Sequence, residues 1–253
     1  MTDANVVGAA RADAVAAAAA AGVAVEAVSA PDELDVLRAT MESIWGAEIV
    51  PPRNLLRGLA LGGACLLVAR RVDDPTPVGF ALGWLGWHDG VHFHSHQVGV
   101  AAAGRGGVVG YALKLAQREL CLAHGITEMR WTFDPMLLSN ARFNFHRLGA
   151  LPVGFIEHCY GDRRDAFNSG ERTDRLEMSW RLDLPLSDTP SAVPAEGDGW
   201  VDVPADYAAL RLADRAAADE ARAVVRHGLR DAFDRAAGVL LGQGGYVIRR
   251  GAG

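Results

Sequence analysis

Residues 98–110 read Val-Gly-Val-Ala-Ala-Ala-Gly-Arg-Gly-Gly-Val-Val-Gly and join a predicted strand to a predicted helix. Successive amides at a helix start point the same way and lie at the positive end of the helix dipole, so such a loop favours anions. Glycine also lets the backbone approach a phosphate closely. Glycine-rich loops of this kind occur for steric reasons too. No Gly-Lys-Ser/Thr follows, which excludes a P-loop, and the antiparallel strands before the loop make a poor dinucleotide fingerprint.

The segments on either side of this loop differ in character. Before it, turn residues separate three predicted strands into an antiparallel meander. After it, helices and strands alternate. The predicted strands are 23–28, 65–71, 78–87, 91–100, 127–133, 151–160, 175–184, 200–203 and 246–250. Residues 29–33 open a predicted helix that runs to about 45, and the other predicted helices are 53–61, 108–124, 139–148 and 206–237.

Composition shifts divide the chain into four segments. Residues 1–22 form an alanine-rich leader, and residues 23–184 carry the alternating pattern. Residues 185–199 are rich in Pro, Ser, Asp and Gly and are interpreted as a linker. Residues 200–253 are predicted to form a helix–strand extension that packs on the core or on a partner subunit.

The composition excludes several classes of protein. Half of the 253 residues are hydrophobic and 22% are charged, which is typical of a folded globular protein. The net charge of −6 gives no footprint for nucleic acid, and no apolar run is long enough to span a membrane. The three cysteines lack metal-site spacing, so we expect no metal, no disulfide scaffold and a cytoplasmic location.

Residues 66–182 resemble the GNAT (Gcn5-related N-acetyltransferase) superfamily, within it a bacterial subgroup of predicted acetyltransferases. The order of elements fits: meander, pyrophosphate loop, helix, strand, short helix and final strands. The matching runs are His94-Ser95-His96, Gly110–Arg118, Trp131–Pro135, Asn140-Ala141, Arg147–Ala150, Tyr160-Gly161, Thr173–Leu176 and, in the tail, Val203–Asp206. Together these runs are specific, although no single one is.

The resemblance implies an α/β (α+β) fold with a mixed, mostly antiparallel central sheet whose strands splay apart, flanked by helices. It makes residues 23–184 an acyl-CoA-binding domain. The pantetheine arm would pair with the backbone near Val98 and Val100. The residues implied in binding the donor are Val98, Val100, Arg105, Gly106, Gly107, Val108, Val109, Gly110 and Asn140. Asn140 has an alternative interpretation as a helix N-cap.

Two residues depart from the family pattern. Val108 stands at the first glycine of the family's loop, where its branched side chain stiffens the turn. Phe145 stands where many members carry a tyrosine that protonates the leaving thiolate, and phenylalanine cannot donate a proton. Both departures support the alternative of a non-catalytic, acyl-CoA-sensing or partner-binding domain.

Histidines are the first candidates for a catalytic base. His92, His94 and His96 alternate along one predicted strand and so share a face. They span too far along it to converge easily on a metal. The resemblance places His94 at the position of a base glutamate, and a histidine there, or His96, could accept the proton of an ammonium acceptor. The alternative is a hydrogen-bonded structural histidine.

Later residues supply the candidate acid and the substrate contacts. Tyr160 ends a strand beside Glu157 and could donate the proton that Phe145 cannot, or lie at an interface. Asp134 either contacts substrate or caps the turn at Pro135. Arginines 163, 164, 172 and 175 surround a polar loop and suit a carboxylate or phosphate, or pair with neighbouring aspartates. We take Asp134, Glu157 and Arg175 as candidate substrate contacts.

The predicted function is transfer of an acetyl or succinyl group from acyl-CoA to a small-molecule amine, which could be an amino acid. The donor is a co-substrate, and no covalent enzyme intermediate is required. Neither nucleic acid nor a membrane is expected as a partner, and a homodimer remains open. The sequence does not name the acyl group or the acceptor.

Overall fold

The computed structural model describes residues 3–102, 107–161 and 173–250. The chain divides into two compact units. The described part of the first unit comprises residues 3–102, 107–130 and 181–184, and that of the second comprises 131–161, 173–180 and 185–250. Among the described residues, the divisions follow residues 130, 180 and 184, and the first two fall inside strands. The domain assignment made from the sequence stays a prediction.

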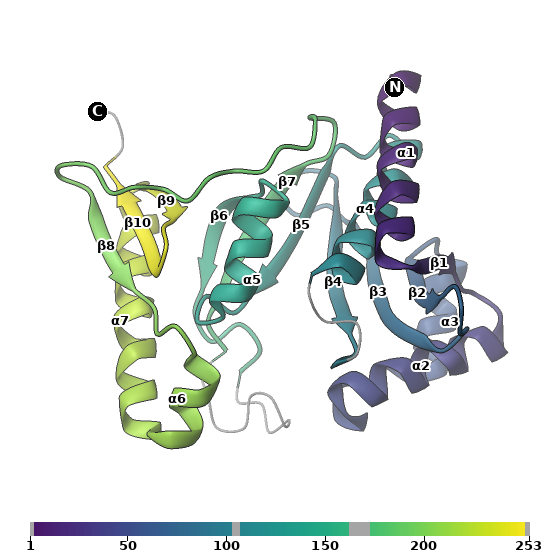
Figure 1. Ribbon diagram of the computed structural model, residues 1–253, viewed down its shortest axis with the longest axis horizontal. Coiled ribbons are helices and arrows are strands. Elements are labelled where there is room, and N and C mark those ends of the chain that lie inside the picture. The colour runs from purple at the N-terminus through teal and green to yellow at the C-terminus, as the bar shows by residue number, and fades with distance from the viewer. Residues whose placement is uncertain (1–2, 103–106, 162–172, 251–253) are drawn as a thin grey trace. The chain divides into compact units, whose positions relative to one another are not determined.

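The first unit is built on an antiparallel meander, as predicted (Figure 1). Its strands are β1 (Val23–Ala27), β2 (Cys65–Arg71), β3 (Pro77–Gly86) and β4 (His92–Val100). Each pairs antiparallel with the next. β5 (Glu128–Phe133) joins β4 in parallel through the pairs Phe93–Met129 and His94–Arg130.

Helices follow where the sequence supplies caps and apolar spacing. They are α1 (Ala4–Ala21), α2 (Pro31–Trp45), the 3-10 turn η1 (Ala47–Ile49), α3 (Arg53–Leu61) and α4 (Val108–Ala123). α2 begins at a proline, and the Glu33 carboxylate accepts hydrogen bonds from the free amides of Ser29 and Ala30. Gly22, with a φ of 64°, ends α1.

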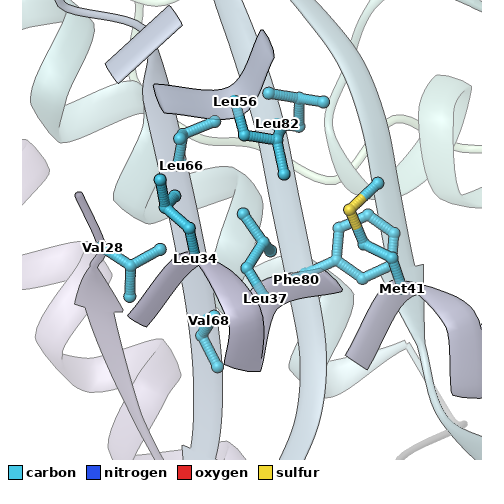
Figure 2. Packing of buried hydrophobic residues seen from close by; sticks show 9 residues of the cluster. All are labelled: Val28, Leu34, Leu37, Met41, Leu56, Leu66, Val68, Phe80 and Leu82. Atoms are coloured by element: carbon cyan, nitrogen blue, oxygen red, sulfur yellow. The ribbon is translucent and has the colours of Figure 1, made fainter. Parts of the chain in front are cut away.

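The core between α2 and the meander holds the first unit together. Leu34, Leu37 and Met41 recur on one face of α2 and are fully buried. They pack against Phe80 and Leu82 of β3 and against β2 (Figure 2). Burying one such side chain contributes about 1.5–3 kcal/mol, so this cluster is a main source of stability for the unit.

The alanine-rich segment forms α1, which packs along α4 (Figure 1). Ala10 and Ala14 are buried there, because small side chains let two helices approach closely. Arg118 of α4 donates to the Asp13 carboxylate at 2.8 Å and to the carbonyl of Leu182. A buried guanidinium therefore ties α1 to α4.

The second unit continues from β5 into short helices and a strand pair. α5 (Leu138–Arg142) runs into a π-helical turn, η3 (Phe143–Arg147), where the sequence predicts a single helix. β6 (Leu151–Ile156) pairs antiparallel with β7 (Arg175–Arg181). Hydrogen bonding gives the strand order β1-β2-β3-β4-β5-β7-β6, which confirms the predicted mixed, mostly antiparallel sheet.

The C-terminal part of the second unit has its own sheet, ordered β8-β10-β9. Its strands are β8 (Gly199–Asp202), β9 (Gly238–Leu241) and β10 (Gly245–Arg249). The prediction of one helix over 206–237 is wrong: α6 (Tyr207–Ala213) and α7 (Arg215–Asp234) are separate. Asp214 has an extended backbone and its carboxylate caps α7 by accepting from Ala217, which ends one helix and starts the next.

Candidate functional site

A β-bulge lies in the middle of β4. Trp84 pairs with His94 and Leu82 with Gln97, which leaves two residues of β4, Ser95 and His96, opposite Gly83. A bulge of this kind changes the side-chain alternation along a strand. Gly83 is required there because a Cβ would collide with the ring of Phe93.

The candidate bases His94 and His96 lie together on the α2 side of β4. Their ring centroids are 5.8 Å apart, and both rings flank Trp84, at 5.6 and 4.8 Å. Burial lowers the pKa of His94 to about 4, and positive charge on His96, His92 and Lys114 adds to the effect. His94 is therefore a neutral imidazole at neutral pH, able to accept a proton. His92 is buried, with Nδ1 3.0 Å from the Gly90 carbonyl oxygen.

The opposite side of the bulge carries a buried polar cluster. Lys114 of α4 donates from Nζ to the Ser95 hydroxyl at 2.9 Å, and that hydroxyl donates to Gln117 at 2.8 Å. Burial lowers the pKa of Lys114 to about 7. Sequence reasoning missed this cluster, although Lys114 is the single lysine of the chain.

The end of β4 presents backbone groups away from β3. Ala101 donates its N–H to the Val78 carbonyl, and Val100 lies opposite Gly79. Because backbone polar groups alternate between the two edges of an antiparallel strand, the N–H and C=O of Val100 point away from β3. Those of Val98, two residues earlier, do the same. Both residues lie beyond the β4–β5 pairs at Phe93 and His94.

The helix after the loop begins with amides that have no partner within the helix. Gly107 has a φ of 86°, and α4 starts at Val108. The first intrahelical bond runs from the Tyr111 N–H to the Gly107 carbonyl, which leaves the earlier amides of Val108, Val109 and Gly110 outside the helical ladder. The Val108 side chain is half exposed. The candidates Arg105 and Gly106 lie outside the described residues.

The second unit brings Tyr160, Arg175 and Asp134 together. The Arg175 guanidinium lies over the Tyr160 ring, 5.5 Å from its centroid. Its Nη1 lies 3.6 Å from the Asp134 carboxylate. The Tyr160 hydroxyl is 3.3 Å from the Thr132 hydroxyl, either of which can donate. Arginines 163, 164 and 172 lie outside the described residues.

Three arginines of α7 reach the candidate substrate contacts, a feature that sequence reasoning missed. Arg222 donates twice to Asp134, at 3.0 and 3.3 Å. Arg226 donates to Asp174 at 2.7 Å, and Arg230 lies 3.5 Å from Glu157. Spacing at i, i+4 and i+8 places all three on one helix face, and that spacing was the signal available in the sequence.

The remaining candidates lie away from this network. Asn140 is exposed inside α5, whose N-cap position is Leu137, so the N-cap interpretation of Asn140 is wrong. Phe145 is buried with its ring 6.1 Å from that of Tyr246. Burial raises the pKa of the Cys65 thiol to about 12 and that of Cys121 further, which leaves both thiols protonated.

The described residues lack two further features. Within residues 3–102, 107–161 and 173–250, no cluster of three or more His, Cys, Asp or Glu side chains is placed to hold a metal ion. Over the same part of the chain, every helix is too short or too polar to cross a membrane.

Comparisons with known proteins were made for both the sequence and the structure. A scan against protein-family models finds no match, and neither does a search of curated proteins. Among solved structures, the ribosomal-protein-S18-alanine N-acetyltransferase of Escherichia coli aligns with a TM-score of 0.50 at 10% identity, over 68% of this chain and 99% of that one.

Two further solved structures are similar at lower scores. An N-acetyltransferase of Staphylococcus aureus has a TM-score of 0.49 at 11% identity, over 63% of this chain and 98% of that one. A GNAT superfamily phosphinothricin acetyltransferase of Sinorhizobium meliloti, solved with AcCoA, has a TM-score of 0.48 at 17% identity, over 70% of this chain and 95% of that one. The similarity to the E. coli enzyme, the strand order and the position of helix α4 directly after β4 together agree. They establish that the chain has the fold of the GNAT acetyltransferases.

Proposed function

We propose that the protein is an acyl-CoA-dependent N-acyltransferase of GNAT type. The observation that carries the proposal is the end of β4, where Val98 and Val100 direct their backbone polar groups away from β3. A pantetheine arm, which carries two amides, could pair there as an added strand does. α4 begins a few residues later, and its first amides would meet the pyrophosphate.

The proposed reaction is a direct transfer. A neutral His94, or His96 beside it, accepts the proton of the acceptor's ammonium group. The amine then attacks the thioester carbonyl, a C–N bond forms, and backbone amides of β4 stabilise the oxyanion. The C–S bond breaks as the tetrahedral intermediate collapses, and Tyr160 protonates the departing thiolate. The extra proton still on the acceptor nitrogen then passes through water to the tyrosinate, which leaves the amide and a neutral Tyr160. No cysteine nucleophile takes part, in keeping with the raised thiol pKa values of Cys65 and Cys121.

The finer assignments extend the same proposal. The acyl group is acetyl or succinyl, and the acceptor is a small-molecule amine such as an amino acid, whose carboxylate would meet Arg175. Asp134 and Glu157 would contact the acceptor's ammonium group, and Asn140 the CoA. A cytoplasmic location and a homodimer remain predictions.

A second candidate is an acyl-CoA-sensing domain that binds the donor without turning it over. Phe145 favours it, because the ring at the family's tyrosine position is buried beside Tyr246 and has no hydroxyl group to donate a proton. The half-exposed Val108 at the start of α4 adds to this argument. Binding without acyl transfer would distinguish this candidate from the enzyme.

Calorimetric titration with acetyl-CoA, succinyl-CoA and free CoA tests the binding half of the proposal. We expect affinity of about micromolar order. Gly107→Glu should abolish it by placing a carboxylate beside the phosphates. Gly125→Glu is the matched control, since Gly125 also has a positive φ and open space around it but lies at the other end of α4. A folded protein that binds none of the three would refute both candidates.

Release of free thiol from the bound donor tests the chemical half. The purified protein is incubated with the preferred acyl-CoA and a panel of amines that includes amino acids. Turnover with any amine supports the enzyme. Tight binding without turnover across the panel leaves the sensing domain.

A further inference from the structure

We propose that Arg222 of α7 is a positioning residue for Tyr160, acting through Asp134 and Arg175. The inference rests on the proposed function in one respect, the role of Tyr160 as the proton donor. Its structural half, that the C-terminal helix fixes the place of the Tyr160 ring, stands on contacts within the second unit alone.

The first link joins Arg222 to Asp134. The Arg222 side chain is 4% exposed and donates through both terminal nitrogens to the two oxygens of Asp134. Its Nε donates to the Tyr207 hydroxyl at 3.1 Å. Two parallel bonds from a planar guanidinium fix the plane and position of a carboxylate, which a single bond does not. The Asp134 carboxylate also accepts from the Met136 amide, which fixes it further.

The second link runs from Asp134 to the Tyr160 ring. Arg175 lies 3.6 Å from an Asp134 oxygen, and its side chain is 11% exposed. Its Nη1 also donates to the carbonyl of Asp174 at 3.0 Å. A guanidinium held at both of these points lies over the Tyr160 ring. The stacked face and the contact with Thr132 together restrict where the phenol can point.

The same helix also holds the backbone that carries Tyr160. Arg226, one turn after Arg222, donates to the buried carboxylate of Asp174, which accepts the His158 amide at 3.1 Å. His158 has a φ of 52°, an uncommon conformation for a residue other than glycine. The Tyr160 amide donates to Thr173 at 2.9 Å. α7 therefore acts on the ring through Arg222 and on the turn through Arg226.

The structural half is tested by ¹⁹F NMR of protein labelled with 3-fluorotyrosine. The chain has four tyrosines, and Tyr160→Phe and Tyr207→Phe assign the two signals that matter. Arg222→Lys keeps the charge but loses the paired geometry. We expect it to shift or broaden the Tyr160 signal. Arg215→Lys is the matched control, because its pair with Asp219 on the same helix is exposed, and it should leave that signal in place.

The functional half is tested by a double-mutant cycle on acyl transfer. Arg222→Lys should lower kcat by about tenfold and change KM for acyl-CoA by less than about twofold. In a Tyr160→Phe background it should lower kcat by less than about twofold more, since the residue it acts through is already disabled. A purely structural role would give the same loss in both backgrounds.

The outcomes separate the two claims. A Tyr160 signal unmoved by Arg222→Lys while the Tyr207 signal moves overturns the positioning role, whether or not the protein is an enzyme. A shifted signal in a protein without acyl transfer supports the positioning role and refutes the enzymatic function. If Arg222→Lys does not fold, Asp134→Asn makes the ¹⁹F NMR test, because it removes the negative charge that contacts both Arg222 and Arg175.

Discussion

Lys114 in the first unit and Arg222 in the second are both buried cations, and the protein handles them in opposite ways. Lys114 donates to the neutral hydroxyl of Ser95, and burial lowers its pKa to about 7. Burial alone would also lower the pKa of Arg222, but the charge and hydrogen bonds of Asp134 reverse the effect and raise it. The first cation can lose its charge near neutral pH, whereas the raised pKa of the second keeps it charged there.

The two units differ in the charge state that each favours for its buried polar groups. Lys114 and His94 are close enough for their charges to interact, and both favour the neutral form. A neutral imidazole has a lone pair that can accept a proton, and the pKa of about 4 makes His94 a weaker base than a free histidine. In the second unit, arginines of α7 instead pair with the carboxylates of Asp134, Asp174 and Glu157. Charge-assisted hydrogen bonds of this kind hold side chains in fixed positions. Four sets of variants test this contrast between the two units.

The largest effect is expected from removing the charge of Arg222. Arg222→Met leaves the Asp134 carboxylate without its bidentate partner in a largely buried place. Breaking one side of such a pair costs about 3–5 kcal/mol, and chemical denaturation would measure it. Arg215→Met on the same helix removes an exposed pair and should cost less than about 1 kcal/mol. Equal losses of unfolding free energy in the two variants would contradict a stabilising role for the buried Arg222–Asp134 pair.

The next effect concerns His94 as a base. His94→Gln should lower kcat by about 100-fold while the protein stays folded. In the native protein, the pKa of about 4 keeps His94 neutral above that value, so its protonation would lower kcat only as the pH falls through it. His88→Gln, on the same hairpin but exposed, is the control. An unchanged kcat in His94→Gln would show that His94 is not the base and would leave His96 as the candidate.

A smaller, pH-dependent effect is expected from Lys114→Met. The folded pKa of Lys114 is about 7 and the unfolded value lies near 10.4, so only the unfolded chain binds this proton between them. The native protein should therefore gain stability from this group as the pH rises through that window, by up to about 1.4 kcal/mol per pH unit.

The measurement for Lys114 is a difference between two proteins. Denaturation of native protein and Lys114→Met at several pH values between 7 and 10 cancels all other titrating groups. Any advantage of the methionine variant should shrink as the pH rises. A difference that does not depend on pH would show that Lys114 keeps its charge in the fold.

The smallest effect is expected at Asp214, where α6 ends and α7, the helix that carries Arg222, Arg226 and Arg230, begins. Asp214→Ala removes the N-cap of α7, which should cost about 1 kcal/mol of unfolding free energy. Asp219→Ala, in the exposed part of the same helix, should cost less. If both variants unfold at the same denaturant concentration, the break between α6 and α7 has another cause.

Local signals predicted much of the fold. The bounds 53–61 and 65–71 agree with α3 and β2, because Pro52 and Gly62–Gly63 mark the ends of the helix and β-branched and apolar residues mark the strand. The meander followed from turn residues alone. The short strand β9 was missed, since four residues between glycines give no period to detect. The single helix over 206–237 failed because Asp214 looks, in sequence, like any polar residue on a helix face.

The candidate site was less accessible to the sequence. The proximity of His94 and His96 follows from strand alternation, but the bulge beside them depends on the pairing with β3. Ion pairs between residues far apart in the chain were harder still to predict from the sequence. Nothing in the spacing of Arg222 and Asp134 indicates that they meet, because long-range ion pairs depend on the packing of whole elements. The roles of the individual site residues stay predictions.

The bulge in β4 has a consequence for insertions and deletions. Ser95 and His96 share one partner, Gly83, while the pairs on either side of them are regular. Loss of His96 alone would leave an uninterrupted ladder in which Ser95 faces Gly83 and Gln97 still faces Leu82. The second imidazole is thus an added residue that the strand accommodates without changing its frame. Deletion of His96 from this chain should therefore remove the bulge and leave the pairing on either side of it unchanged.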